Sequence, residues 1–196
     1  MDLERRFDEH YYRQFYLDPL TRAMGPEDFN KLGDFVCSYL KYLEQPVNTV
    51  LDIGCGLGLW SNIVQRHFPQ AIYTGVEISD YVCTRYGWQK GSVVNWTTNK
   101  TFDLVICSDV VQYLEDDDAI AAIENLARLC EGVLYFAVLT ERDWQENCDQ
   151  DRTDPVGYLR SGRWYRDQLK THFTNIGGGL FAAPESPTVR YDLEEL

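Results

Sequence analysis

TVLDIGCGLG, at residues 49–58, is the stretch that decides the fold of this chain. Its apolar first half predicts a buried strand, and the glycines at 54, 56 and 58 predict a tight turn into a helix over residues 59–68, LWSNIVQRHF. Glycine has no Cβ, so the backbone can turn sharply there and approach a ligand closely. A glycine-rich turn of this kind can also occur without any ligand, and the motif therefore needs support from elsewhere in the chain.

That support comes from Glu77, which ends the next predicted strand, AIYTGVEI at 71–78, and lies 23 residues after Gly54. A carboxylate in this place can accept two hydrogen bonds from a ribose diol. A dinucleotide site has similar geometry, but its fingerprint needs a glycine where this chain has Leu59, and it has no need of Asp52. The pattern favours a ligand with a positively charged amino-acid tail over one with a pyrophosphate.

Strands and helices alternate along the rest of the chain, which predicts a parallel sheet covered on both faces. The periodicity predicts an amphipathic helix behind Pro26, over residues 27–45, and a terminal hairpin in GGGLFAAPESPTVRYDLEE at 177–195. The remaining predicted strands are 93–96, 102–107 and 132–139, and the remaining predicted helices are 117–130 and 163–173.

Two acidic segments need an interpretation. The acids at 115–118 precede a helix, and we interpret them as complementing its dipole rather than as a metal site. Residues 141–158 are polar and aperiodic, which predicts a long loop on the rim where ligands bind in open α/β sheets. The acids of that loop suit a cationic acceptor or a solvated surface, and we favour the solvated surface: Glu141, Asp143, Glu146, Asp149, Asp151 and Asp154.

Composition narrows the class of protein further. A formal charge of −13 argues against a nucleic-acid partner, and no stretch is apolar enough to span a membrane. The six cysteines lack zinc-type spacing, which predicts free thiols in a reducing compartment. Without an evident export signal, we expect a cytoplasmic protein with no metal.

The segments VLDIGCGLG (50–58), GVEIS (75–79) and FDLVICSDVVQYLED (102–116), in this order and spacing, resemble the class I S-adenosylmethionine (SAM)-dependent methyltransferases. The resemblance implies an α/β, three-layer Rossmann-like fold with a mostly parallel seven-stranded sheet that ends in an antiparallel hairpin. It extends from about residue 27 to the end of the chain, and it implies SAM as cofactor and S-adenosylhomocysteine as product.

The resemblance also implies which residues bind the cofactor. Asp52 and the glycine loop would hold the methionine portion, and Glu77 would bind the ribose hydroxyls. Relatives often place an acid beside the adenine, where this chain has Ser92. They often have a Glu-His pair after the fourth strand, where this chain has Gln112 and Tyr113. The expected cofactor contacts are Asp52, Gly54, Cys55, Gly56, Gly58, Glu77, Ile78, Ser92, Val93, Ser108 and Asp109.

The aromatic N-terminal segment, residues 1–26, is expected to form a lid ahead of the methyltransferase domain, residues 27–196. The alternative is that its rings pack against the sheet edge. We expect His10 and Tyr11 to be the catalytic candidates if the acceptor needs a base. The expected acceptor contacts are Tyr12, Tyr16, Tyr113, Trp144 and Tyr158.

The sequence therefore predicts methyl transfer to the oxygen or nitrogen of a small-molecule acceptor, by proximity and orientation. Two other functions stay open: a nicotinamide-dependent oxidoreductase on the same scaffold, and a non-catalytic module that binds SAM. A protein acceptor is disfavoured because no accessory domain is visible in 196 residues. The identity of the acceptor, the atom methylated and the oligomeric state are left open.

Overall fold

A seven-stranded sheet forms the centre of the molecule, with strand order β3-β2-β1-β4-β5-β7-β6. The computed structural model describes residues 3–192. Strands β3, β2, β1, β4 and β5 run parallel, and β7 pairs antiparallel with both β5 and β6. The predicted fold, a mostly parallel sheet that ends in an antiparallel hairpin, is thereby confirmed.

Most elements lie close to their predicted ranges. The strands are β1 (Thr49–Ile53), β2 (Ile72–Glu77), β3 (Gln89–Lys90), β4 (Phe102–Ser108), β5 (Cys130–Ala137), β6 (Thr174–Asn175) and β7 (Leu180–Ala182). The helices are α1 (Leu3–Arg6), α2 (Glu9–Tyr12), α3 (Pro26–Tyr42), α4 (Leu59–His67), α5 (Asp80–Tyr86), α6 (Asp116–Leu129), α7 (Glu141–Glu146) and α8 (Gly162–Leu169). A π-helical turn follows α2 at Arg13–Leu17, and a 3₁₀ turn follows β4 at Val111–Tyr113.

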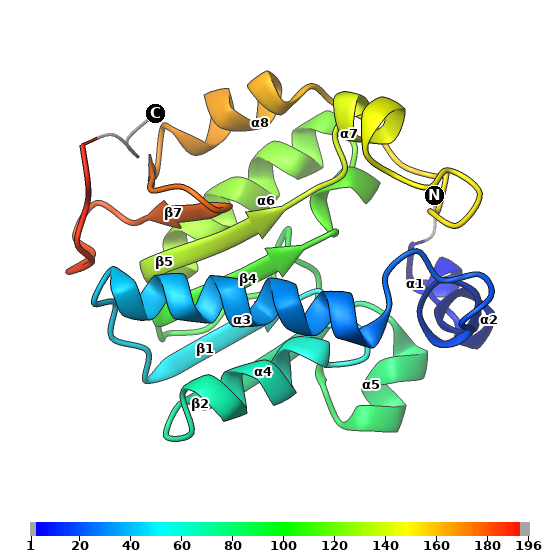
Figure 1. Ribbon diagram of the computed structural model, residues 1–196, viewed down its shortest axis with the longest axis horizontal. Helices are drawn as coiled ribbons and strands as arrows, with labels where there is room; N and C mark the ends of the chain where they lie inside the picture. The colour runs from blue at the N-terminus through cyan, green and yellow to red at the C-terminus, as the bar shows by residue number, and fades with distance from the viewer. Residues whose placement is uncertain (1–2, 193–196) are drawn as a thin grey trace.

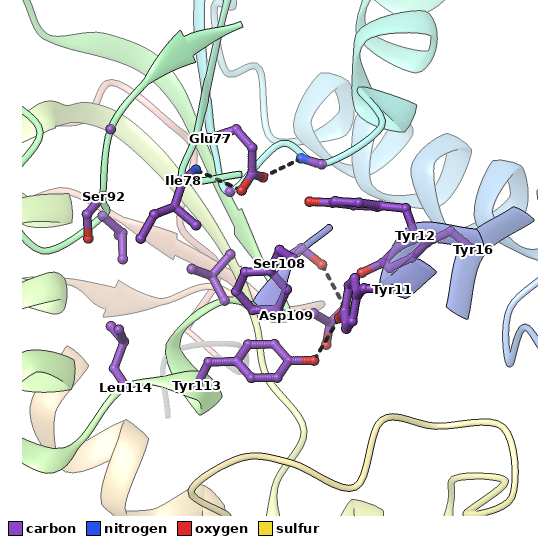
Figure 2. Close-up of a pocket in the computed structure, with 16 residues that line it drawn as sticks. Tyr11, Tyr12, Tyr16, Glu77, Ile78, Ser92, Ser108, Asp109, Tyr113 and Leu114 are labelled. Carbon is purple, nitrogen blue, oxygen red and sulfur yellow. Dashed lines mark hydrogen bonds between the residues drawn. The ribbon is translucent and has the colours of Figure 1, made fainter. Parts of the chain in front are cut away.

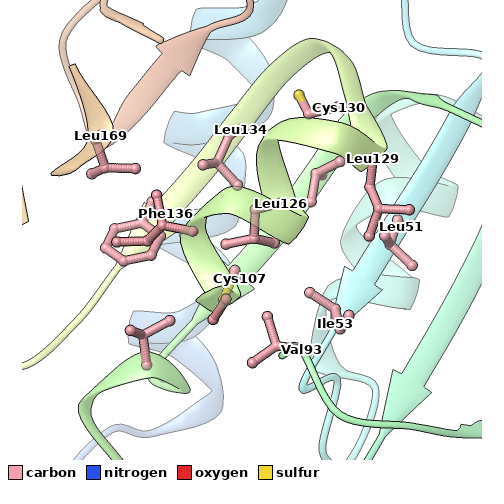
Figure 3. Packing of buried hydrophobic residues seen from close by; sticks show 14 of the residues in the cluster. Leu51, Ile53, Val93, Cys107, Leu126, Leu129, Cys130, Leu134, Phe136 and Leu169 are labelled. Atoms are coloured by element: carbon pink, nitrogen blue, oxygen red, sulfur yellow. The ribbon is translucent and has the colours of Figure 1, made fainter. Parts of the chain in front are cut away.

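Two apolar cores hold helices on opposite faces of the sheet (Figure 1). Helices α3 and α4 pack on one face through residues such as Leu40 and Ile63. On the other face, α6 and α8 pack through Leu126 and Leu169, and Figure 3 shows this second core. Alternate residues of β1 serve the two cores, because successive strand side chains point to opposite faces.

The predicted strand at 93–96 is wrong. Those residues form a turn in which the backbone N–H groups of Asn95 and Trp96 donate to the Ser92 carbonyl, at 3.2 and 2.8 Å. Val93 is buried, and Trp96 packs against the same core, so their apolar character reflects packing from a turn. The two-residue strand β3 occupies the sheet edge instead.

Two further expectations need correction. The terminal hairpin lies earlier than predicted, because it pairs β6 with β7 around three glycines of positive φ, residues 177–179. Residues 183–192 contain no strand, and 193–195 lie outside the described residues. The loop expected over 141–158 begins with helix α7, whose first turn is capped by the Thr140 side chain.

None of the helices described between residues 3 and 192 has the combination of length and apolar composition that a bilayer crossing requires. All six cysteines are free thiols, as the sequence predicts.

Candidate functional site

The carboxyl ends of the central strands open into a cavity. It lies where β1 has parallel neighbours on both sides, β2 and β4, which is the switch point at which open α/β sheets bind their ligands. Figure 2 shows tyrosines of the N-terminal segment and residues of the strand ends around one space. We call it the first cavity, and its lining is Phe7, Tyr11, Tyr12, Tyr16, Gly54, Gly56, Glu77, Ile78, Gly91, Ser92, Val93, Ser108, Asp109, Val110, Tyr113 and Leu114.

The glycine loop after β1 is shaped by positive φ angles at Gly54, Gly56 and Gly58. A Cβ on Gly54 would lie 2.2 Å from a methyl carbon of Val110, so the close approach itself requires glycine. Behind the loop, the Trp88 indole N–H donates to the Gly56 carbonyl at 3.0 Å. The loop is therefore held from both sides while Gly54 and Gly56 line the cavity.

Glu77 ties the end of β2 to this loop. One carboxylate oxygen accepts from the Gly56 N–H at 2.8 Å, and the other accepts from the N–H groups of Ile78 and Ser79, at 2.7 and 3.0 Å (Figure 2). Burial raises the pKa of the Glu77 carboxyl, and these backbone hydrogen bonds oppose the rise. A carboxylate has about four acceptor positions, so it retains capacity for hydroxyl donors from a ligand.

Asp52 lies below the loop and is absent from the cavity lining. It is 2% exposed, and its carboxylate accepts a hydrogen bond from the Tyr73 hydroxyl. Burial raises the pKa of Asp52 to about 7, although the hydrogen bond from Tyr73 opposes the shift. Cys55 and Gly58 belong to the loop but are also absent from the lining.

A second, larger cavity adjoins the first over the ends of β4 and β5. Its walls are largely apolar and include Phe15, Met24, Phe29 and Trp144. Five residues line both cavities and form the boundary between them: Tyr11, Tyr16, Ser108, Asp109 and Tyr113.

A polar network crosses this boundary. The hydroxyls of Tyr11 and Tyr113 lie 3.0 Å apart, and Tyr113 donates to Asp154 at 3.1 Å. Arg6 donates to the same carboxylate, with one contact at 2.5 Å. Desolvation raises the pKa of both tyrosines, so both hydroxyls stay protonated at neutral pH.

Asp109 has an unusual backbone conformation, with a φ of +59°. Among the described residues that are not glycine, Glu44 is the other one with a positive φ. Its carboxylate accepts from Ser108 at 3.3 Å and from the Gln112 amide at 3.4 Å. Burial raises the pKa of Asp109. A non-glycine residue in this region carries strain, which is often found at functional sites.

Most of the predicted site residues line one or both of these cavities. Tyr12 lines the first cavity, Trp144 lines the second, and three predicted residues line both: Tyr11, Tyr16 and Tyr113. His10 is exposed and lines neither cavity. Tyr158 also lines neither, and its hydroxyl donates to Glu115 at 3.0 Å.

Several residues of the site are not predicted from the sequence. The expected solvated surface is wrong for Asp154, whose side chain is 6% exposed and pairs with Arg6. These two residues are 148 positions apart, so no local pattern links them. Gly91 also lines the first cavity, and a Cβ there would lie 2.4 Å from Trp96. Helix α5 could have been found from Ser79, which caps it, and from Gly87, which ends it.

Residues 9–178 match a family described as a methyltransferase domain. The chain belongs to this family. The match confirms the predicted class of SAM-dependent methyltransferases, whose methyl donor is S-adenosylmethionine. The match begins at residue 9, within the N-terminal segment.

Relatives of this methyltransferase-family chain agree with the match. A ubiquinone biosynthesis O-methyltransferase of Coxiella burnetii is 30% identical over 118 residues, which is 51% of this chain and 49% of that protein. The nodulation protein S of Sinorhizobium fredii is 26% identical over 99 residues, 46% of each chain. The chain thus spans about half the length of these curated relatives.

Solved structures share the fold of this family member. The plantazolicin methyltransferase BpumL, in complex with a desmethyl analog and S-adenosylhomocysteine, has a TM-score of 0.58 at 16% identity, and the match covers 85% of this chain and 68% of that one. Streptomyces venezuelae DesVI has a TM-score of 0.56 at 15% identity, over 84% and 92% of the two chains. At such identities the similarity establishes the fold alone.

Proposed function

We propose that this chain transfers a methyl group from SAM to an oxygen or nitrogen atom of a small molecule. The observation that carries the proposal is the pair of adjoining cavities at the switch point of the sheet, one lined by the glycine loop and Glu77 and the other largely apolar. The first would hold the cofactor and the second the acceptor.

The first cavity fits SAM on its own chemistry. Its lining includes two carboxylates, Glu77 and Asp109, and no lysine or arginine, which suits a cationic ligand and disfavours a pyrophosphate. The nicotinamide alternative is disfavoured for the same electrostatic reason.

Each part of the cofactor has proposed contacts. Glu77 would accept hydrogen bonds from the ribose hydroxyls, and Ile78, Ser92 and Val93 would surround the adenine. Gly54, Gly56 and Ser108 would border the methionine portion. Asp52, Cys55 and Gly58 would act by shaping the loop, since they do not line the cavity.

The bound cofactor supplies an electrophilic methyl group, so the protein's own contribution is to orient the acceptor and exclude water. Phe7, Tyr11, Tyr12 and Tyr16 cover the first cavity from the N-terminal side. We propose that residues 1–26 act as the lid of both cavities. The size of the second cavity and its apolar walls support a small acceptor with an apolar body.

Calorimetry with S-adenosylhomocysteine and its 2′-deoxyribose analogue tests the central contact. The wild type should bind the parent compound at least about tenfold more tightly than the deoxy compound, because a hydrogen bond to a charged group is lost. Glu77→Gln should weaken binding and remove most of this discrimination. Glu124→Gln, on the exposed face of α6, is the matched control and should behave as wild type.

Equal affinity for both compounds in the folded wild type would contradict the ribose contact. No binding of either compound would contradict SAM binding altogether and favour a different ligand. Methyl transfer to any acceptor would exclude the non-catalytic alternative.

A further inference from the structure

Asp109 is the single carboxylate that lines both cavities, since Glu77 lines the first alone and Asp154 the second alone. Asp109 is exposed, and the surrounding protein atoms raise the pKa of its carboxyl by desolvation. Because Asp109 lines both cavities, part of its exposed surface faces them. The carboxylate thus lies where donor and acceptor would meet.

The Asp109 carboxylate has spare hydrogen-bonding capacity. Both of its side-chain hydrogen bonds are long, at 3.3 and 3.4 Å, and no lysine, arginine or histidine within residues 3–192 forms an ion pair with it. Asp154, the other carboxylate of the second cavity, is instead neutralised by Arg6. A carboxylate with two long hydrogen bonds and no counter-ion retains capacity for a further donor, and a hydrogen bond to a charged group is stronger than one between neutral groups.

Two other polar groups at the boundary are engaged with each other. The hydroxyls of Tyr11 and Tyr113 share a hydrogen bond, and Tyr113 donates its proton to Asp154. Beside the boundary, the Gln112 amide N–H₂ donates to Asp109, while its Oε1 atom is buried, has no partner among the described residues and faces the second cavity alone. Asp109 is therefore the charged acceptor that borders both cavities, and Gln112 Oε1 is a neutral acceptor of the second cavity only.

We propose that the Asp109 carboxylate binds the N–H or O–H group of the methyl acceptor and removes its proton during transfer. This inference rests on the proposed function and names the acceptor class: an apolar body carrying a hydroxyl or amine at one edge. An acceptor whose nucleophile is a carboxylate would be repelled by Asp109. Walls such as Phe29, Leu32 and Trp144 would hold the apolar body.

The proposed step balances. The acceptor's oxygen or nitrogen forms a bond to the methyl carbon, the carbon–sulfur bond of the donor breaks, and its electron pair stays on sulfur. The proton of the nucleophile passes to the Asp109 carboxylate and then to water. No further oxidant, reductant or metal is needed for the balance.

The test uses four probes of one shape, each titrated into the full chain saturated with S-adenosylhomocysteine: 2-naphthol, 2-(aminomethyl)naphthalene, 2-methylnaphthalene and 2-naphthoate. Wild type should bind the naphthol and the amine at least about tenfold more tightly than methylnaphthalene, which has no donor, and naphthoate most weakly. Asp109→Asn should reduce the preference for the two donor probes to within about threefold while still binding S-adenosylhomocysteine.

Asparagine suits this test because it tolerates positive φ better than other non-glycine residues, so the variant should keep the local backbone. Asp117→Asn, which removes an equal charge from the exposed start of α6, is the control and should keep the wild-type preference. The rate of methyl transfer to 2-naphthol, measured with SAM, should fall at least about tenfold in Asp109→Asn and be unchanged in the control.

The following results would contradict the proposed role of Asp109. Unchanged preference in Asp109→Asn would show that the carboxylate does not contact the acceptor. Loss of S-adenosylhomocysteine binding in that variant alone would make Asp109 a cofactor ligand. Equal weakening of all four probes would indicate a structural role, and no binding of any probe to wild type would exclude the acceptor class. Failure of the wild type itself to bind S-adenosylhomocysteine would instead contradict the proposed function.

Discussion

Asp52 combines nearly complete burial with a single side-chain partner, the Tyr73 hydroxyl. Its folded-state pKa of about 7 lies above the value near 3.8 expected when the chain unfolds. A raised pKa means that the folded state binds the proton more tightly. This contribution to stability is therefore complete below about pH 4 and is lost as pH rises towards 7 and above.

We expect Asp52→Asn to remove this pH dependence. The amide oxygen can still accept from Tyr73, and no charge needs to be buried. The variant should match the wild type below about pH 4 and exceed it in free energy of unfolding at pH 8, by up to about 4 kcal/mol. Urea unfolding at both pH values measures the difference. An equal difference at both pH values would show that Asp52 does not titrate in this range.

Gly54 gives a second prediction about a single residue. Gly54→Ala places a Cβ 2.2 Å from Val110 and forces alanine to a φ of +81°, so we expect a loss of roughly 2–4 kcal/mol of stability. The double variant Gly54→Ala/Val110→Ala should recover part of the loss, because it removes the collision but leaves the strained φ. Denaturant unfolding of the two single variants and the double variant checks this. Strictly additive losses would contradict the proposed collision.

The sequence predicts the residues of the first cavity better than those of the second. Gly54, Gly56 and Glu77 belong to a strand, turn and strand pattern with fixed spacing, and such local patterns position them correctly. Arg6 and Asp154 meet only because the folded chain brings its start beside the 141–158 segment. His10 looked suitable by residue type, but α2 directs Tyr11 and Tyr12 inward and leaves His10 exposed.

Among the elements, the N-terminal segment packs Phe7, Tyr11 and Tyr12 into a third apolar cluster with the rest of the domain, and polar contacts add to this packing. Arg6 pairs with Asp154 and also lies about 6 Å from the ring centroids of Phe7, Tyr11 and Tyr113. Ser79 donates a hydrogen bond to the Phe7 carbonyl. These contacts fix α1 and α2 over the cavities rather than at the outer edge of the sheet.

We expect Arg6→Met to loosen this segment without unfolding the domain. Asp154 would keep its contact with Tyr113 but lose its counter-ion, which is costly for a buried carboxylate. Hydrogen exchange of amides in residues 3–17 should accelerate at least about tenfold, while the strands stay protected. Lys31→Met, which breaks an exposed pair with Asp28, is the control. Unchanged exchange in residues 3–17 would show that the ion pair does not hold the segment.

Element boundaries were predictable where the pattern was long and periodic. Helices α3 and α6 and strands β1, β4 and β5 each begin and end within a few residues of the predicted limits. The short elements were not predictable, because a two-residue strand such as β3 is specified by pairing with β2 and not by its own sequence. Apolar residues at 93 and 96 pack inward from a turn and so resembled a strand.

At the scale of the whole molecule, binding of the cofactor product should increase the free energy of unfolding. A ligand at 100 times its dissociation constant stabilises the folded state by about 2.7 kcal/mol when it does not bind the unfolded chain. For a domain of this size, S-adenosylhomocysteine at that concentration should raise Tm by roughly 5–10 °C. Nicotinamide adenine dinucleotide should leave Tm unchanged. A larger rise with the dinucleotide would favour the oxidoreductase alternative.

The position of the first cavity was predictable from the order of the strands, because β1 lies between β2 and β4. The second cavity was not predictable, because segments far apart in the sequence meet there only in the folded chain. Its walls come from the N-terminal segment, α3, α4, the end of β5 and residues 144–159.

Two of the five tryptophans give the molecule separate optical probes for its two cavities. Trp144 lines the second cavity, while Trp88 supports the glycine loop through its bond to the Gly56 carbonyl. An acceptor should therefore change the emission of Trp144 directly, and a cofactor should reach Trp88 through the loop. Fluorescence of variants that retain one of these indoles would report which ligand enters first, and so the kinetic order of binding.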